Sequence, residues 1–386
     1  MLCTQEFIDS REEKYVLCNV LKHVSKKMEK KNEHINMFND PYCIKESFCH
    51  FLNVPRFTKI ANLVIDHESS ILLDNNKLYC SIDGYIKIFD TKTFQLIKYL
   101  YPDYLKQNMS HRMGTLRHCF TLHKNKLFST GPRHDCTIRV WDTEKYEELA
   151  IINLINCWVN SLAHDDKKLY SGTNNGLIYV WDIETYERVT ILNEHNDTNN
   201  LSNIYSINSL IIHENKLFSC VSYRGVIIWD TDSYEIIGRF CFFISPNFRI
   251  DCISIYKNNL YVGSNNGHIT IWKLENKHLK IKNPENYSDV EWLNLADTVI
   301  KSDKDDTYTS CRSFAFQDNK MYYGCNDGII RIRCTETNER IFTDFCIDHR
   351  DQYIENYDHY DYIKSLIIKD NKLYSSSRRL TSVWYI

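Results

Sequence analysis

The sequence predicts an all-β fold in which seven repeats of four short strands form a closed ring. Three observations lead to this prediction: a phrase that recurs seven times, a fixed order of strand and turn residues in each copy, and a last copy that is one strand short. The clearest copy, at Lys168–Asp182, reads K-L-Y-S-G-T-N-N-G-L-I-Y-V-W-D. Repeats that recur about every 45 residues are typical of arrays in which each unit buries its apolar face against the next unit.

Each repeat is anchored on one apolar residue that follows the first lysine or asparagine of the phrase. The anchors lie 42 to 61 residues apart and are Leu78, Leu127, Leu169, Leu217, Leu260, Met321 and Leu373. A small residue stands eight positions before each anchor, at Ser70, Cys119, Ser161, Ser209, Cys252, Ser313 and Ser365. We call it the small residue of the repeat. Its recurrence predicts a crowded inner strand near the axis of the ring.

The second and third strands of a repeat are joined by a tight turn. The turn dipeptides are Asp83-Gly84, Asn175-Gly176, Asn266-Gly267 and Asp327-Gly328. Asn-Gly and Asp-Gly accept positive φ angles, so they predict a two-residue hairpin between antiparallel strands. The third strand ends in an I-x-V-W-D pattern, and a second polar turn leads to a fourth strand such as Glu187–Leu192.

Four antiparallel strands in a unit of this size describe a propeller blade. Over residues 56–386 the units resemble WD repeats, in the K-L-F/Y-S-G…G-x-I-x-V-W-D form of propellers appended to alpha-kinases and TRAF-type ubiquitin ligases. The resemblance implies a seven-bladed propeller that binds partners on the face of its inter-blade linkers. The usual Gly-His before the first strand is missing, and Glu194-His195 comes nearest to it. We therefore expect most blades to lack the Asp–His–Ser–Trp hydrogen-bond tetrad and to be held mainly by apolar packing.

The two ends of the chain predict how the ring closes. The seventh repeat stops at Ile386 after its third strand, and an unpaired strand edge is a hazard. We expect the alternating segment Arg56–Val64 to supply the missing strand, as an N-terminal strand does in WD-repeat propellers. Residues 1–55 form an extension in which Tyr15–Met28 has helical apolar spacing. This predicted helix packs on the propeller, binds a partner or assists targeting.

Composition narrows the class of protein. The formal charge of −3 in 386 residues gives no reason to expect nucleic-acid binding. No apolar run is long enough to span a membrane, and the N-terminus has no secretory pattern. The 15 cysteines include no C-x-x-C pair, which predicts reduced thiols in the cytoplasm, with the nucleus also possible, and no metal site.

Catalytic motifs are missing from the chain. It contains no glycine-rich phosphate loop, no G-x-S-x-G and no H-E-x-x-H. Seven nearly equivalent units without a shared acid–base pair suit a platform better than an enzyme. We therefore expect a protein that is not an enzyme and needs no cofactor.

The longest linker is the insertion 276–309. Ser288 and Glu291 form a capping-box pattern, and apolar residues continue at helical spacing to Ile300. A loop this long in a compact fold is often functional. The insertion is either a docking helix anchored by Trp292 or a surface segment without a role.

Residues just before the small residue of each repeat should point towards the linker face. Trp, Tyr and Arg are enriched in interface hot spots, and several stand at these positions. The predicted partner-binding residues are Arg117, Trp158, Asn160, Arg249, Asp251, Trp292, Arg312, Tyr362 and Lys364. Of these, Trp292 belongs to the insertion. Alternatively, Trp158 caps the core and the charged side chains are solvated.

These observations predict a protein-interaction scaffold or adaptor that assembles a complex through its linker face. The expected partners are proteins or peptides. The alternative is a substrate receptor of a ubiquitin ligase, with residues 1–55 engaging the ligase. Against it, the repeats read W-D-T-E, W-D-I-E and W-D-T-D and lack the W-D-x-R form common in such receptors. Phosphoinositide binding would need an F-R-R-G loop, and Arg378-Arg379 stands outside such a sequence.

Overall fold

The structure is a computed structural model. It describes residues 58–64, 70–82, 85–102, 119–131, 136–193, 206–222, 224–241, 249–275, 296–300, 310–341, 347–348, 362–377 and 380–386. The chain divides into two compact units, Met1–Arg56 and Phe57–Ile386, and all described residues belong to the second. The helix predicted within residues 1–55 therefore lies outside the described residues.

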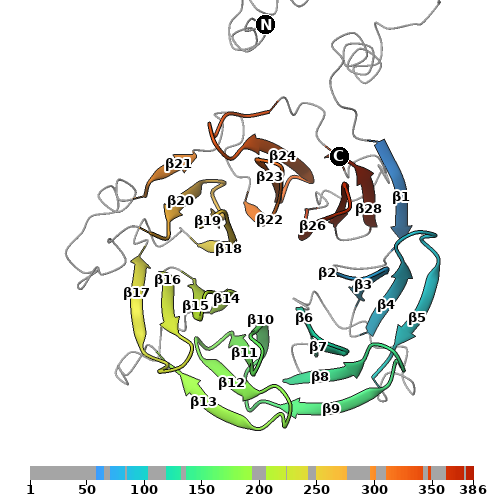
Figure 1. The fold of residues 1–386 in the computed structure, drawn as a ribbon, viewed down its shortest axis with the longest axis vertical. Helices are drawn as coiled ribbons and strands as arrows, with labels where there is room; N and C mark the ends of the chain where they lie inside the picture. Colours follow the sequence, from blue (N-terminus) through green and yellow to red (C-terminus); the bar gives the residue numbers. More distant parts are fainter. Residues whose placement is uncertain are drawn as a thin grey trace, which may run out of the picture. The chain divides into compact units, whose positions relative to one another are not determined.

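The described residues form a seven-bladed β-propeller, which confirms the predicted fold class. Strands β1 to β28 make seven antiparallel four-stranded sheets, the blades, arranged in a ring (Figure 1). In blades 1 to 6 the strands follow chain order from the centre of the ring outward. We label the four strands of each blade a to d in that direction.

The blades have the following strands. Blade 1 contains β2 (Ile71–Asp74), β3 (Lys77–Ile82), β4 (Tyr85–Asp90) and β5 (Leu96–Leu100). Blade 2 contains β6 (Phe120–His123), β7 (Lys126–Thr130), β8 (Thr137–Asp142) and β9 (Glu148–Asn153). Blade 3 contains β10 (Val159–His164), β11 (Lys168–Thr173), β12 (Ile178–Asp182) and β13 (Arg188–Leu192). Blade 4 contains β14 (Ile207–His213), β15 (Lys216–Val221), β16 (Gly225–Asp230) and β17 (Ile236–Cys241).

The other three blades depart slightly from this plan. Blade 5 contains β18 (Ile250–Tyr256), β19 (Asn259–Ser264), β20 (Ile269–Lys273) and the short β21 (Thr298–Ile300). Blade 6 contains β22 (Cys311–Gln317), β23 (Lys320–Cys325), β24 (Ile329–Cys334) and the two-residue β25 (Ile347–Asp348). Blade 7 contains β26 (Ser365–Lys369), β27 (Lys372–Ser376), β28 (Leu380–Tyr385) and, as strand d, β1 (Thr58–Val64).

Strand β1 closes the ring, as the sequence predicts. It pairs antiparallel with β28, with Leu63 opposite Thr381. Ser382 Oγ donates a hydrogen bond to Asn62 Oδ1 at 2.8 Å, and the buried Leu63 and Val383 share an apolar cluster with strand b of blade 1. The first described strand therefore satisfies the outer edge of the last one.

The outer strands of blades 5 and 6 are short, and that of blade 5 lies inside the insertion 276–309. Strand β21 pairs with β20, Ile300 is buried, and Ala296 packs against the neighbouring core. The helix predicted to continue to Ile300 is therefore wrong at that end, because Val299 and Ile300 complete the edge of blade 5 instead. Strand β25 likewise completes blade 6 by pairing with Ile329 and Ile330 of β24.

The core lies between neighbouring blades. Each of the seven anchor residues is at most 1% exposed, which explains why the anchor is always apolar. Burying one such side chain contributes about 2 kcal/mol. The glycine of K-L-Y-S-G is required by the close approach of the next blade. A Cβ on Gly172 would overlap Ile207, and a Cβ on Gly324 would overlap Ile363. Strand b therefore carries glycine where the following blade approaches most closely.

The turn between strands b and c is longer than predicted. Thr173 N donates to Leu177 O at 3.0 Å, and Gly176, with φ of 81°, has the positive φ of this turn. This is a three-residue hairpin in which a tight turn is followed by a left-handed glycine. Gly267 and Gly328 repeat the arrangement with φ of 79° and 78°. The predicted two-residue turn is therefore wrong in these three blades, while Asp83-Gly84 lies outside the described residues.

Polar pairing supplements apolar packing inside the blades. The indole N–H of the tryptophan in strand c donates to a serine hydroxyl of strand b at 2.9 to 3.1 Å, in the pairs Trp141–Ser129, Trp181–Ser171, Trp229–Ser219 and Trp384–Ser375. Four blades thus keep the Ser–Trp half of the tetrad. The expectation that apolar packing mainly holds the blades together leaves out this contribution of about 1 kcal/mol per bond.

The turn between strands c and d explains the aspartate of the W-D motif. One carboxylate oxygen accepts the backbone N–H groups two and three residues later, at 2.7 to 3.0 Å, in Asp90, Asp142, Asp182 and Asp230. Both bonds lower the pKa of all four carboxyls, and the N–H group three residues after the aspartate has the larger effect. In blade 6 Cys334 takes this position, and the N–H groups of Thr337 and Glu336 lower the pKa of its thiol.

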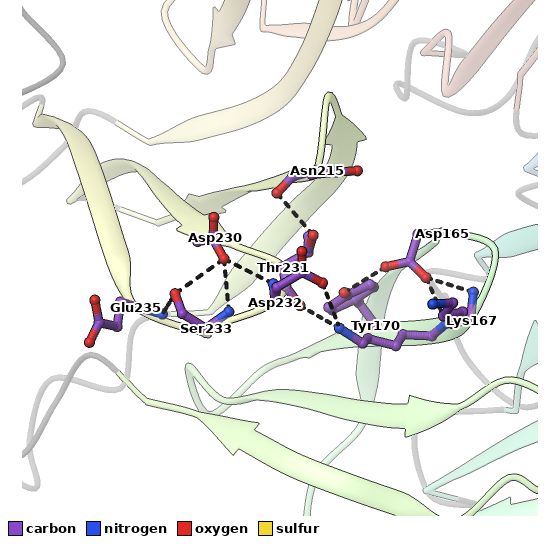
Figure 2. Close-up of polar contacts among 10 residues, drawn as sticks. Asp165, Lys167, Tyr170, Asn215, Asp230, Thr231, Asp232, Ser233 and Glu235 are labelled. Carbon is purple, nitrogen blue, oxygen red and sulfur yellow. Dashed lines mark hydrogen bonds and ion pairs between the residues drawn. The ribbon is translucent and has the colours of Figure 1, made fainter.

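The same turns connect blades 1 to 4 each to the blade before it. An aromatic residue four positions after the aspartate has the left-handed conformation, with φ of 58° to 64°, at Phe94, Tyr146, Tyr186 and Tyr234. The lysine before the anchor of the preceding blade places its ammonium 4.8 to 5.5 Å from the ring centre, in the pairs Lys372–Phe94, Lys77–Tyr146, Lys126–Tyr186 and Lys168–Tyr234. We call each pair a lysine–aromatic latch. Figure 2 shows the turn after Asp230 beside Asp165 and Tyr170 of blade 3.

Candidate interaction face

The linker face of the propeller is formed by the starts of the a strands and the turns between strands b and c. An asparagine in the b–c turn holds the start of strand a by two reciprocal hydrogen bonds. Asn174 Oδ1 accepts from Trp158 N at 2.8 Å, and Asn174 N donates to Trp158 O at 3.1 Å. The pairs Asn265–Arg249 and Asn326–Ser310 repeat this geometry at 2.8 to 3.0 Å. The backbone at the start of strand a is therefore held in place in blades 3, 5 and 6.

Arg249 and Asp251 form an ion pair at the start of blade 5. Arg249 Nε donates to Asp251 Oδ1 at 2.7 Å, and Ser310 Oγ of blade 6 donates to Asp251 Oδ2 at 2.5 Å. The side chain of Asp251 is 2% exposed, whereas that of Arg249 is 31% exposed. Asp251 therefore supports Arg249 and joins two blades, while Arg249 remains accessible from solvent.

The residue before the small residue reaches the next blade in four successive blades. Asn160 Nδ2 donates to Ser206 Oγ at 2.6 Å, and Asn208 Nδ2 donates to Ile250 O at 2.7 Å. Asp251 accepts from Ser310, as described above, and the guanidinium of Arg312 lies 5.2 Å from the ring centre of Tyr362. We call these four contacts the inner-strand relay. It connects blades 3 to 7 in one direction around the ring.

The relay includes residues that sequence reasoning missed. Asn208, Ser206 and Ser310 take part in it although none is among the predicted site residues. The signal was available, because Asn208 stands directly before the small residue Ser209, as Asn160 stands before Ser161. Its partner cannot be found from spacing, since the contact joins separate blades.

The predicted partner-binding residues fall into three groups. Asn160 and Asp251 are buried in the relay. Five are partly exposed at the starts of a strands and are Trp158, Arg249, Arg312, Tyr362 and Lys364. Arg117 and Trp292 lie outside the described residues. The structure therefore brings five partly exposed side chains of four types to the same end of the inner strands.

Six of the cysteines among the described residues are buried, and they are Cys80, Cys157, Cys220, Cys252, Cys311 and Cys325. Burial raises the pKa of the Cys80 thiol to about 12, and burial raises that of Cys311 well above its ordinary value. Cys252 Sγ donates to Cys311 O at 3.4 Å across the boundary of blades 5 and 6. Within the described ranges, no cluster of three or more His, Cys, Asp or Glu side chains could hold a metal ion. Nor does that part of the chain contain a helix long and apolar enough to span a membrane.

Comparison with known proteins supports the fold and goes no further. No family model matches the chain, and no curated protein matches it in sequence. Among solved structures, the β-propeller domain of Cps50 (Swd1) from Myceliophteria thermophila superimposes with a TM-score of 0.64 at 11% identity, covering 86% of this chain and all (100%) of that domain. The computationally designed Ika8 protein superimposes with a TM-score of 0.54 at 17% identity, covering 84% of this chain and 98% of Ika8. The class shared with Cps50 (Swd1) is the β-propeller.

Proposed function

We propose that the protein is a non-enzymatic scaffold that binds partner proteins or peptides through its linker face. One observation carries the proposal: large side chains that differ between blades stand on backbone that equivalent asparagines hold in the same way. Trp158 and Arg249 occupy matching positions in blades 3 and 5, and each is clamped by the asparagine of its b–c turn. A rigid frame that presents unlike side chains is suited to selective recognition, because little ordering entropy is lost on binding.

This proposal gives the predicted partner-binding residues two different roles. Trp158, Arg249, Arg312, Tyr362 and Lys364 make contact with the partner, whereas Asn160 and Asp251 keep the blades aligned beneath them. Arg117 and Trp292 remain predicted contacts. We also propose a cytoplasmic or nuclear location, because the cysteines of the described residues are not joined in disulfides and several are buried.

Affinity purification of the full chain tests the proposal. Trp158→Ala combined with Arg249→Gln should reduce recovery of the partners at least tenfold, since glutamine keeps an N–H donor for Asp251 and spares the fold. The matched control is Lys92→Ala with Glu144→Ala on the opposite face, where surface changes shift stability by less than about 0.5 kcal/mol. Loss of partners in the control and not in the test variant would show that the binding face is wrong. Recovery of a ubiquitin-ligase core would favour the substrate-receptor alternative.

A further inference from the structure

Two histidines meet at the joint of blades 2 and 3. His123 ends strand a of blade 2, and His164 ends strand a of blade 3. Their rings meet edge-on, with 5.2 Å between the ring centres. The two strands that carry them, β6 and β10, are neighbours at the inner side of the ring (Figure 1). We call this contact the histidine pair.

The joint of blades 5 and 6 has an aromatic pair at the same two positions. There Phe316 of blade 6 stacks on Tyr256 of blade 5, with 4.8 Å between the ring centres. Tyr256 and His123 each stand four residues after the small residue of their repeat. Phe316 and His164 each stand three residues after theirs. The histidine pair is therefore the same ring contact made from side chains of a type whose charge changes between about pH 5 and 8.

Sequence and burial set the histidine pair apart from the other joints. At the position of His164 the other six repeats have an apolar residue, namely Leu73, Leu122, Ile212, Ile255, Phe316 and Ile368. At the position of His123 the residues of the other six repeats are half-buried, whereas His123 is 6% exposed. Blade 4 has His213 there, but Glu214 Oε1 lies 3.8 Å from its Nε2. Only at the joint of blades 2 and 3 is a buried imidazole covered by a second one.

The elements packed against His123 carry charges of both signs. Those of its own blade and of blade 3 are Lys124, Lys126, Asp166 and Glu184. Strand a of blade 1 ends in Asp74, which stands opposite Lys77 in the neighbouring strand.

These charges do not supply His123 with a counter-ion of its own. Lys126 and Lys124 bind Glu184 at 2.6 and 3.1 Å and lower the pKa of its carboxyl to about 2, so in mild acid Glu184 stays ionised and shared. Asp166 is exposed to solvent. Burial first, and then the nearby His164 and Lys124, lower the pKa of His123. Among the described residues, its Nε2 has no hydrogen-bond partner. The closed joint therefore fits the neutral ring.

We propose that the histidine pair is a pH-sensitive joint, which is closed while His123 is neutral and opens when this ring takes up a proton. A buried charge without a counter-ion is costly, so the protonated ring turns out to solvent and leaves His164. The pair lies at the ends of the a strands, on the face opposite to Trp158 and Arg249. It does not depend on the function proposed for the linker face.

The direction of the pH dependence follows from the two states of His123. A solvated imidazole has a pKa of about 6.5, and the pKa of the buried ring is lower, so the open joint binds more protons than the closed one. The stability of the joint is therefore fully present above about pH 6.5 and is lost as the pH falls through that value.

Hydrogen exchange of the full-length protein measures this opening at single amides. Thr143 N donates to Asn125 O in the turn after His123, and Ile183 N donates to Lys167 O in the turn after His164, both at 2.9 Å. Between about pH 7.5 and 5.5 the open population at these two amides, corrected for intrinsic exchange, should rise about tenfold, as one proton taken up with a pKa of about 6.5 requires.

The aromatic pair provides the control within the same molecule. Leu274 N donates to Asn258 O in blade 5 and Thr335 N donates to Asn319 O in blade 6, at 3.0 and 2.7 Å. Opening at these two amides should rise less than about twofold over the same pH range, because histidine is the side chain that titrates there. An equal rise at both joints, or no rise at Thr143 and Ile183, would overturn the proposal.

Variants identify the group that takes up the proton. His123→Tyr with His164→Phe places the ring pair of blades 5 and 6 at this joint, and the open populations at Thr143 and Ile183 should then be the same at both pH values. The matched control is His213→Tyr, which removes the histidine at the same position of blade 4 and should keep the tenfold rise. If the double variant responds to acid as the wild type does, another group takes up the proton and the proposal is wrong. Should the double variant fail to fold, the comparison of the two joints in the wild-type protein still decides the question.

Discussion

Removing the Asp251 carboxylate should destabilise the propeller more than removing a surface acid. The substitution Asp251→Ala deletes the acceptor of Arg249 Nε at 2.7 Å and of Ser310 Oγ at 2.5 Å. A hydrogen bond to a charged group contributes about 1.5–3 kcal/mol. Because Arg249 is partly exposed and water can solvate it, its share takes the lower end of that range. We expect a loss of about 3 kcal/mol in the free energy of unfolding.

A second substitution at the same position isolates the charge. Asp251→Asn introduces the residue that blades 3 and 4 use at the matching position, namely Asn160 and Asn208. An amide can still accept from Ser310, so this variant should lose about 1 kcal/mol. The difference of about 2 kcal/mol between the two variants measures the charged share of the interaction.

Urea unfolding followed by tryptophan fluorescence measures both variants. The three midpoints should decrease in the order wild type, Asp251→Asn, Asp251→Ala, with similar slopes. A ring of seven blades can unfold in more than one step, so the transitions should also be compared by circular dichroism. If Asp251→Ala unfolds at the wild-type midpoint, the contact between Asp251 and Ser310 does not stabilise the joint of blades 5 and 6.

Three further predictions concern the packing of the ring. Trp181→Ala should cost about 3–5 kcal/mol by emptying a buried aromatic site, and an unchanged thermal melt would contradict the blade assignment. Deletion through Leu63 should lower solubility and melting temperature far more than deletion through Lys31, because it removes β1; equal behaviour of the two truncations would refute closure by that strand. Gly324→Ala should cost about 1–3 kcal/mol because the new methyl group meets Ile363, and a calorimetric melt within error of wild type would show that blade 7 can move away.

The repeat made most of the ring predictable. Small residues such as Ser161 recur eight positions before anchors such as Leu169, and this pattern, together with the turns between the strands, predicts four strands per blade and the order of the blades. The closing strand was predictable because the seventh repeat has only three strands, so its outer edge needs a strand from elsewhere in the chain. These features depend on local pattern, which a single chain displays directly.

Features that depend on contacts between blades were less accessible. Asn160 reaches a residue 46 positions away, and Asp251 a residue 59 positions away, so their structural role is invisible in the local sequence. Their polarity and place near the linker face suggested binding instead. Strand β21 was taken for part of a helix because its three residues are too few to show alternation.

The pairing of β1 with β28 has a consequence for how the protein is made. Asn62 and Ser382, which bond across this joint, are 320 residues apart, so the contact cannot form until Ser382 has left the ribosome. Until then the edges of β1 and of the unfinished seventh sheet are open to other chains in the crowded cell. Non-local pairing of this kind is slow and exposes intermediates to aggregation. The period between synthesis of β1 and its pairing with β28 is therefore the time at which these strand edges are most exposed to pairing with other chains.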